Sequence, residues 1–130
     1  PGEAAHLLST TSEVVQADRF AAARAIVDKF GGVCVLKGAG TVVCSAGDAS
    51  FDLCDAGNPG MATAGMGDVL TGIIAALLAQ GLAPRDAERL GVWLHARAGD
   101  DAAAQSGEIG LLASDLFTPL RALVNKLAQT

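Results

Sequence analysis

The strongest candidates for chemistry lie in the segment Ala64-Gly65-Met66-Gly67-Asp68, shortly before an apolar stretch. Glycines that lead into a helix leave its first backbone amides free, and such amides bind anions. A carboxylate would repel an incoming phosphate, so Asp68 fits this place if it takes a proton. The segment predicts a phosphoryl-transfer site in which Ala64, Gly65, Met66 and Gly67 form an anion hole and Asp68 is the catalytic base. The alternative is that Asp68 only caps the helix.

A second candidate is Lys37-Gly38-Ala39-Gly40-Thr41, which follows an apolar run. In open α/β sheets, ligands bind beyond the carboxyl ends of strands. The two glycines would let a ligand approach the backbone, while Lys37 offers a charge for phosphate and Thr41 a hydroxyl. A tight hairpin turn with a solvated lysine explains these residues equally well. The segment is neither a Walker A motif nor a dinucleotide fingerprint, so both interpretations stay open.

Several short segments predict the elements that must position these residues. Thr10 and Glu13 have the form of a capping box, which places a helix N-cap at Thr10. The apolar run Val33–Leu36 predicts a strand buried on both faces. Thr41–Ser45 and Phe51–Cys54 predict a β-hairpin near a sheet edge. The apolar stripe Phe20, Ala23, Val27 and Phe30 predicts that the helix capped by Thr10 continues to Gly31. Apolar periodicity, glycines and prolines predict further helices over residues 69–80, 84–98 and 114–127, with Pro119 leaving the start of the last one uncertain.

Composition narrows the class of protein. Hydrophobic residues make up 51% of the 130 residues and charged residues 18%, which favours a folded α/β protein with helices on a parallel sheet. We expect residues 1–130 to form one domain or part of one. The net charge of −5, without a Lys/Arg cluster, argues against a nucleic-acid partner.

The cysteines, the longest apolar run and the first residues give no sign of a disulfide framework, a membrane span or a signal peptide. Cys34, Cys44 and Cys54 lack CxxC spacing, so we interpret them as small buried hydrophobes. The run Val69–Leu82 is too short to span a bilayer and is expected to be a buried helix. The first residues lack the layout of a signal peptide, and we expect a cytoplasmic protein without a membrane partner.

Single residues with weaker signals are assigned structural roles by default. A lone mid-helix histidine such as His95 is most often partly buried and structural. Asp100 and Asp101 are adjacent on a helix and point in different directions, which disfavours a metal site. Met61 and Met66 flank glycines and are candidates to line the site, although gap filling is the ordinary role of methionine.

Two longer stretches resemble a known family. The segment Val35-Leu36-Lys37-Gly38-Ala39-Gly40-Thr41 and the segment from Gly57-Asn58-Pro59-Gly60 through Gly67-Asp68-Val69-Leu70 are similar to the ADP/ATP-dependent NAD(P)H-hydrate dehydratases. Pro1-Gly2-Glu3, Gly91-Val92-Trp93-Leu94-His95 and Gly110-Leu111-Leu112-Ala113-Ser114-Asp115-Leu116 also resemble family segments. The resemblance covers nearly the whole chain.

The resemblance implies the C-terminal half of a ribokinase-like three-layer α/β/α sandwich that repairs the 6S hydrate of NADH or NADPH. It implies ADP or ATP as phosphoryl donor with Mg²⁺. By this resemblance Lys37, Gly38, Ala39, Gly40, Thr41 and Gly67 contact the adenine nucleotide, Asp68 meets the hydrate, and Asn58 is a further candidate for substrate contact.

The chain also departs from the family pattern, and this leaves alternatives open. The histidine that precedes Pro-Gly-Glu in the family would lie before Pro1, and the family domain is about twice as long. We therefore expect a C-terminal partial domain that forms a homo-oligomer or associates with a missing N-terminal half, and that is inactive alone. The alternatives are a ribokinase-like kinase for a vitamin precursor such as hydroxyethylthiazole, and a non-catalytic nucleotide-binding fragment.

Overall fold

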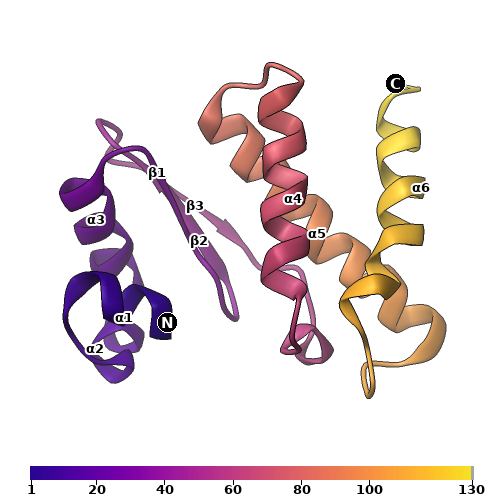
Figure 1. Cartoon of the computed structure of the whole chain (residues 1–130), viewed down its shortest axis with the longest axis horizontal. Helices are drawn as coiled ribbons and strands as arrows, with labels where there is room; N and C mark the ends of the chain where they lie inside the picture. The colour runs from indigo at the N-terminus through magenta and orange to yellow at the C-terminus, as the bar shows by residue number, and fades with distance from the viewer. Residues whose placement is uncertain (130) are drawn as a thin grey trace. The chain divides into compact units, whose positions relative to one another are not determined.

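A computed structural model describes residues 1–129, which divide into two units. The first unit comprises residues 1–55 and 83–89, and the second comprises residues 56–82 and the chain from residue 90 onward. Both units share the long helix α5 (Pro84–Ser106), whose first residues belong to the first unit. The elements are labelled in Figure 1.

Three helices and a three-stranded sheet make up most of the first unit. The helices are α1 (Gly2–Leu8), α2 (Ser12–Ala17) and α3 (Arg19–Phe30), and the strands are β1 (Val33–Leu36), β2 (Thr41–Ser45) and β3 (Phe51–Cys54). Helix α3 packs on β1 and β2, where Ala23 and Val27 are buried against the sheet (Figure 1). The bounds of all three strands agree with the sequence prediction.

The sheet is antiparallel throughout, with the order β1-β2-β3. Cys34 lies opposite Cys44, and Leu36 lies opposite Val42 at the end that carries the first loop. The prediction of a parallel sheet is therefore wrong for these three strands. Their connections, residues 37–40 and 46–50, are hairpin loops, whereas parallel neighbours need a long crossover. The predicted hairpin of β2 and β3 is confirmed.

Local details of the first unit differ from the sequence pattern in three places. The single helix predicted between Thr10 and Gly31 is divided into α2 and α3, because Asp18 caps a new helix start there. The N-cap of α2 is Thr11 and not Thr10, and its hydroxyl accepts a hydrogen bond from the Val14 amide at 3.4 Å. On α3, Phe20 and Phe30 remain 45% and 55% exposed, so the predicted apolar stripe is buried only at its centre. Phe20 instead meets the Phe51 ring edge to face, with the centroids 5.1 Å apart.

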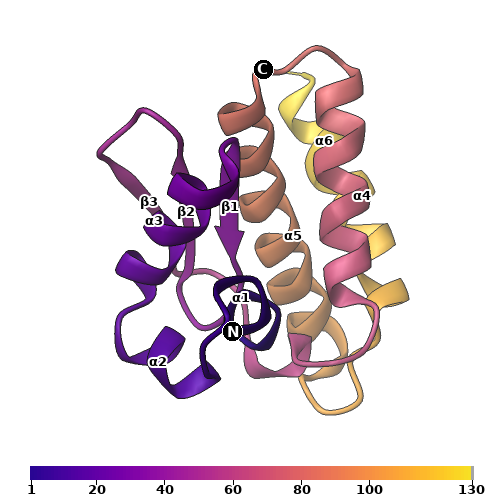
Figure 2. The ribbon, with the colours of Figure 1, turned by 60° about the vertical axis from the view of Figure 1, so that its left-hand side comes forward.

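Helices form the second unit, with α4 (Met66–Ala79) beside α5 (Figure 2). A Cβ at Gly91 would lie 2.7 Å from the Ile74 Cγ1 atom, so the glycine allows these two helices to approach closely. The short turns η1 (Pro59–Met61) and η2 (Ala113–Leu116) and the last helix α6 (Phe117–Leu127) complete the unit. Pro119 is the third residue of α6, where it is tolerated because first-turn amides have no partner within the helix.

Helix α4 is less buried than its composition predicts. Met66 and Leu70 are buried, whereas Leu78 is 41% exposed. The prediction of a buried helix is therefore wrong for most of α4, because apolar composition does not say which element covers each face. Over residues 1–129, no helix has the length and apolar character needed to cross a membrane.

Candidate active site

The predicted site residues fall into two groups, one in each unit. Lys37–Thr41 links β1 to β2 in the first unit, whereas Asn58 and Ala64–Asp68 lie in the second. The first group occupies a hairpin loop, as the structural interpretation of the sequence predicted. Hairpin geometry alone does not exclude ligand binding, so the contacts of the loop decide what it can do.

Two glycines give the first loop a conformation that other residues rarely adopt. Gly38 has φ 147° and Gly40 has φ 68°, both in the region that favours glycine. The Thr41 hydroxyl donates a hydrogen bond to the Gly38 carbonyl at 3.3 Å. Thr41 therefore fixes the loop from within, in addition to offering its hydroxyl oxygen to a ligand.

Arg19, the first residue of α3, holds the same loop from outside. Its guanidinium donates to the Leu36 carbonyl at 2.9 Å and also to the Ala39 carbonyl. A Cβ on Gly38 would lie 3.0 Å from the Arg19 Nη2 atom, so the glycine leaves room for the guanidinium. No local pattern in the sequence indicates this contact, since the partners lie 17 and 20 residues apart.

Lys37 is partly exposed and forms an ion pair. Its Nζ atom lies 3.2 Å from the Glu3 Oε2 atom, and the two side chains are 45% and 81% exposed. Ion pairs this exposed contribute little to stability. The ammonium therefore remains available to a phosphate that displaces Glu3.

A half-buried carboxyl and a buried thiol lie in the same unit. Burial raises the pKa of Glu88 to about 7, and its Oε2 atom is buried without a hydrogen-bond partner. Burial, with smaller effects from Cys44 and Glu88, raises the pKa of the Cys34 thiol to about 11. Burial also raises the pKa of Cys44. All three cysteines are free. Cys34 and Cys44 are buried as predicted, whereas Cys54 is only half-buried.

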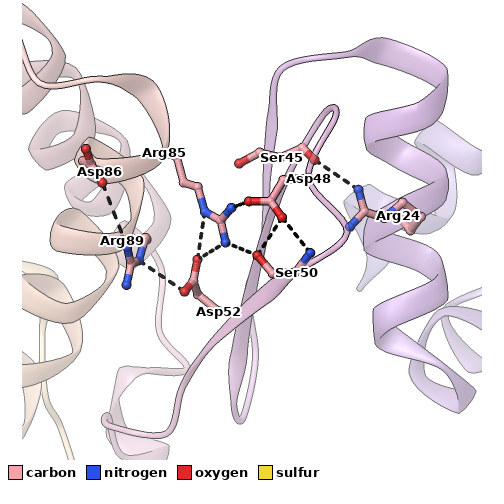
Figure 3. A network of polar contacts seen from close by, with 8 residues as sticks. All are labelled: Arg24, Ser45, Asp48, Ser50, Asp52, Arg85, Asp86 and Arg89. Atoms are coloured by element: carbon pink, nitrogen blue, oxygen red, sulfur yellow. Dashed lines mark hydrogen bonds and ion pairs between the residues drawn. The ribbon is translucent and has the colours of Figure 1, made fainter.

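A polar network connects the hairpin of β2 and β3 to the start of α5 (Figure 3). Arg85 donates through Nη2 and Nε to the Asp52 carboxylate at 2.8 and 3.1 Å, and it also pairs with Asp48 and donates to the Ser50 hydroxyl. Arg89 pairs with Asp52 at 3.2 Å. Part of the signal was available in the sequence, because Arg85 and Arg89 are one helical turn apart and lie on one face of the helix.

In the second unit, α4 begins earlier than predicted, so Gly67 and Asp68 belong to its first turn. Gly65 is the N-cap, with φ 85°, and no side chain caps the helix. The first-turn amides consequently have neither intrahelical carbonyls nor a side-chain cap to accept their hydrogen bonds. The Asp68 side chain is exposed beside this positive helix end.

Two contacts hold this helix end in place. The His95 Nε2 atom lies 2.9 Å from the Met66 carbonyl, which can only accept, so the proton is on Nε2. The Thr71 hydroxyl donates to the Gly67 carbonyl at 2.9 Å. His95 is half-buried and structural, as predicted.

The other candidates in this unit have structural partners. The Met66 side chain is buried in the core, and Met61 packs where a Cβ on Gly99 would overlap its sulfur, so both fill gaps as expected. Asn58 accepts from the Gly60 amide at 3.1 Å and donates to the Asp100 carboxylate at 3.0 Å. These bonds engage both ends of the Asn58 amide group.

The adjacent residues Asp100 and Asp101 on α5 bind different partners. Asp100 accepts hydrogen bonds from the Gly57 amide at 2.9 Å and from Asn58, whereas Asp101 pairs with Arg97 at 3.1 Å. The described part of the chain holds no group of three or more His, Cys, Asp or Glu side chains suited to a metal ion.

Solved structures of the same fold define the class of protein. A ribokinase-like superfamily protein from Enterococcus faecalis superposes with a TM-score of 0.75 at 34% identity, over 89% of this chain and 39% of that one. An ADP/ATP-dependent NAD(P)H-hydrate dehydratase from Bacillus subtilis, crystallised with ATP and Mg²⁺, gives a TM-score of 0.78 at 29% identity, over 86% of this chain and 40% of that one. The chain is thus an α/β protein of ribokinase-like fold.

The family follows from sequence comparison. The family model for NAD(P)H-hydrate dehydratase matches residues 1–121. The bifunctional NAD(P)H-hydrate repair enzyme of Vibrio cholerae is 55% identical over 96% of this chain and 25% of its own length. The ADP-dependent (S)-NAD(P)H-hydrate dehydratase of Neisseria meningitidis is 47% identical over all of this chain and 44% of its own length. The chain belongs to the NAD(P)H-hydrate dehydratase family and spans less than half of these relatives.

Proposed function

We propose that this chain supplies the nucleotide-binding and phosphoryl-transfer part of an ADP- or ATP-dependent NAD(P)H-hydrate dehydratase. The observation that carries the proposal is the start of α4, where uncapped first-turn amides lie beside the exposed Asp68. Family membership and the activities named for the relatives support the same function. Neither alternative, a vitamin-precursor kinase or a non-catalytic fragment, has comparable support.

Each candidate residue takes a role that its surroundings allow. In the first unit, Lys37 and the loop Gly38–Thr41 are the proposed contacts to the adenine nucleotide. In the second unit, Gly67 is the candidate that the family resemblance gives. The amides of residues 64–67 would neutralise charge on the transferring phosphoryl group. Asn58, whose side chain is held by Asp100, would border the substrate.

In the proposed reaction Asp68 removes the proton from the C6 hydroxyl of the hydrate as that oxygen attacks the terminal phosphoryl group. The oxygen–phosphorus bond forms while the nucleotide leaves one phosphate shorter. Phosphate then departs from C6 with its bonding electrons, and loss of a proton from the neighbouring ring carbon restores the nicotinamide double bond.

The side chains available as metal ligands indicate how the proposed Mg²⁺ would bind. The described residues offer no cluster for a resident ion, and Mg²⁺ often binds through phosphate oxygens with only one or two carboxylates. We therefore propose that Mg²⁺ enters as part of the nucleotide co-substrate. The nucleotide would then arrive with its charge already partly neutralised by the ion.

The proposed partners are the NAD(P)H hydrate and either a second copy of the chain or a segment that corresponds to the rest of the longer relatives. Leu78 of α4, which is 41% exposed, supports such an association, since exposed apolar surface commonly marks interaction sites. Light scattering on the chain alone, which we expect to reveal oligomers, tests this partnership. A monodisperse monomer would contradict it.

A chimera tests the function. The matching segment of the Neisseria meningitidis dehydratase is replaced by this chain, and the chimera receives hydrated NADH, ADP or ATP, and Mg²⁺. We expect the near-ultraviolet absorbance of NADH to return in step with phosphate release. A stable phosphorylated product would favour the kinase alternative. ADP binding without any reaction would favour the non-catalytic one, and circular dichroism verifies that the chimera folds.

A further inference from the structure

We propose that Arg19 is the positioning residue that holds the Lys37–Thr41 loop in its nucleotide-binding conformation. This inference rests on the proposed function, because it assumes that the loop binds ADP or ATP. Arg19 is the first residue of α3, whose N-cap Asp18 accepts a hydrogen bond from the Ala21 amide at 2.9 Å. The arginine therefore extends from a fixed helix end toward a loop of the neighbouring sheet.

The guanidinium spans two peptide groups of the loop. It donates to the Leu36 carbonyl at 2.9 Å and to the Ala39 carbonyl, one bond from each terminal nitrogen. Only a planar fork such as that of arginine presents two donors in this fixed geometry. A lysine ammonium at the same place keeps the charge but concentrates its donors at one point.

Holding these carbonyls also orients amides. In a trans peptide the carbonyl and the following N–H point in opposite directions. With the Leu36 and Ala39 carbonyls directed at Arg19, the amides of Lys37 and Gly40 point away from it. The proposed nucleotide contacts lie on these same residues, so Arg19 acts on the ligand through the backbone.

The loop is shaped to accept the arginine. Gly38 has φ 147°, and a Cβ there would lie 3.2 Å from the Arg19 Cζ atom. The guanidinium thus packs against Gly38, and the Arg19 side chain is only partly exposed. A side chain at residue 38 would therefore crowd the guanidinium that binds the two carbonyls.

The same helix offers a matched control. Arg24 also donates to a main-chain carbonyl, that of Ser45, at 3.0 Å, and its guanidinium lies 4.9 Å from the centroid of the Phe51 ring. Ser45 is paired with Val33, at the end of the hairpin opposite to the loop. Arg24 therefore has the same chemistry and helix as Arg19, but not its contact with the loop.

The experiment compares Arg19→Lys and Arg19→Ala with Arg24→Lys and Arg24→Ala in the 130-residue chain. Hydrogen–deuterium exchange is measured by mass spectrometry on peptides that cover the loop, without nucleotide, and ADP affinity is measured by calorimetry. We expect both Arg19 variants to exchange faster in the loop and to bind ADP about tenfold more weakly, which corresponds to the loss of one charge-assisted hydrogen bond. The Arg24 variants should change ADP affinity less than about twofold.

Arg19→Lys keeps the positive charge, so its loss of affinity should persist in high salt. Full affinity in Arg19→Lys, or loop exchange equal to that of the Arg24 variants, would overturn the role of Arg19. Faster exchange throughout β1 and β2 would also overturn it, because the effect would then be general destabilisation. If the unaltered chain binds no ADP, the proposed nucleotide site fails first, and that result is distinct from the failure of Arg19 alone.

Discussion

The two glycine-containing segments expose backbone amides by different means. In the loop Lys37–Thr41, side chains from outside and within hold the carbonyls, and the amides turn away as a result. At Gly65–Asp68, the helix arranges its own amides, since a first turn has donors without intrahelical acceptors. ADP binding by the first segment should therefore depend on remote side chains and on salt concentration. ADP binding by the second segment should depend on the geometry of its own glycines.

The largest expected effect concerns the carboxylate at the helix end. Asp68→Asn in the chimera should lower the rate of hydrate dehydration about 100- to 10,000-fold, because a general base typically contributes that much. Nucleotide affinity, measured by calorimetry, should stay nearly unchanged.

Asp115 provides the control for a capping role. Its carboxylate accepts a hydrogen bond from the Leu112 amide at 2.9 Å at the start of η2, so Asp115→Asn removes the charge of a capping carboxylate without removing the proposed base. We expect Asp115→Asn to lower thermal stability and to spare the chemical step. If Asp68→Asn behaves in the same way, Asp68 is a cap and not a base.

The second effect tests the amides of the same helix end. Gly67→Val should weaken ADP binding by about tenfold or more, because a branched Cβ would block the approach of phosphate to the first-turn amides. The melting temperature of the unliganded chain should change less. Gly72→Val is the matched control on α4, since a Cβ at Gly72 meets nothing within 4 Å. Equal ADP affinity in the two variants would place the phosphates elsewhere.

The sequence predicted elements best where local signals determine them. Breaker residues bound the strands, and Gly31 and Pro84 mark the end of α3 and the start of α5 as expected. The start of α4 at Met66 was missed because Gly67 disfavours a helix, whereas burial of Met66 in the core stabilises the extra turn. Here tertiary packing outweighs local propensity.

The sequence indicates the candidate residues of the site but not their contacts. The glycine segments and Asp68 are visible in the sequence, because unusual residues stand together there. The contact of Arg19 with Ala39 joins residues of ordinary type across 20 positions, and nothing local indicates it. Which side chain holds a loop depends on how α3 packs on the sheet, and that packing is a tertiary property.

The third prediction concerns a pH dependence of stability that arises in the first unit and not in the second. Burial raises the pKa of Glu88, in the first unit, from 4.5 to about 7. The folded state then binds this proton more tightly than the unfolded state does, so the stabilisation is complete below about pH 4.5 and is lost as pH rises through about 7. At pH 8, Glu88→Gln should raise the free energy of unfolding by about 1–2 kcal/mol, after allowance for the solvent screening of a partly exposed side chain.

Urea unfolding at pH 4 and pH 8 measures this effect, and the gain should vanish at the lower pH. Glu108→Gln, an exposed glutamate of the second unit, is the control and should change stability little at either pH. A gain of equal size at both pH values would show that the amide packs better for reasons unrelated to the proton.

The smallest effect concerns Lys37, which is 45% exposed and paired with Glu3. Lys37→Ala should raise the dissociation constant of ADP about three- to tenfold in low salt, and by less in high salt, because a partly exposed ammonium is screened. Glu3→Gln should have the opposite sign and bind ADP slightly more tightly in low salt, since the lysine no longer has a competing carboxylate. Calorimetry at two salt concentrations measures both variants, with Lys126→Ala as an exposed control on α6. If Lys37→Ala binds ADP normally in low salt, Lys37 is a solvated turn residue, and the loop can act only through the amides that Arg19 orients.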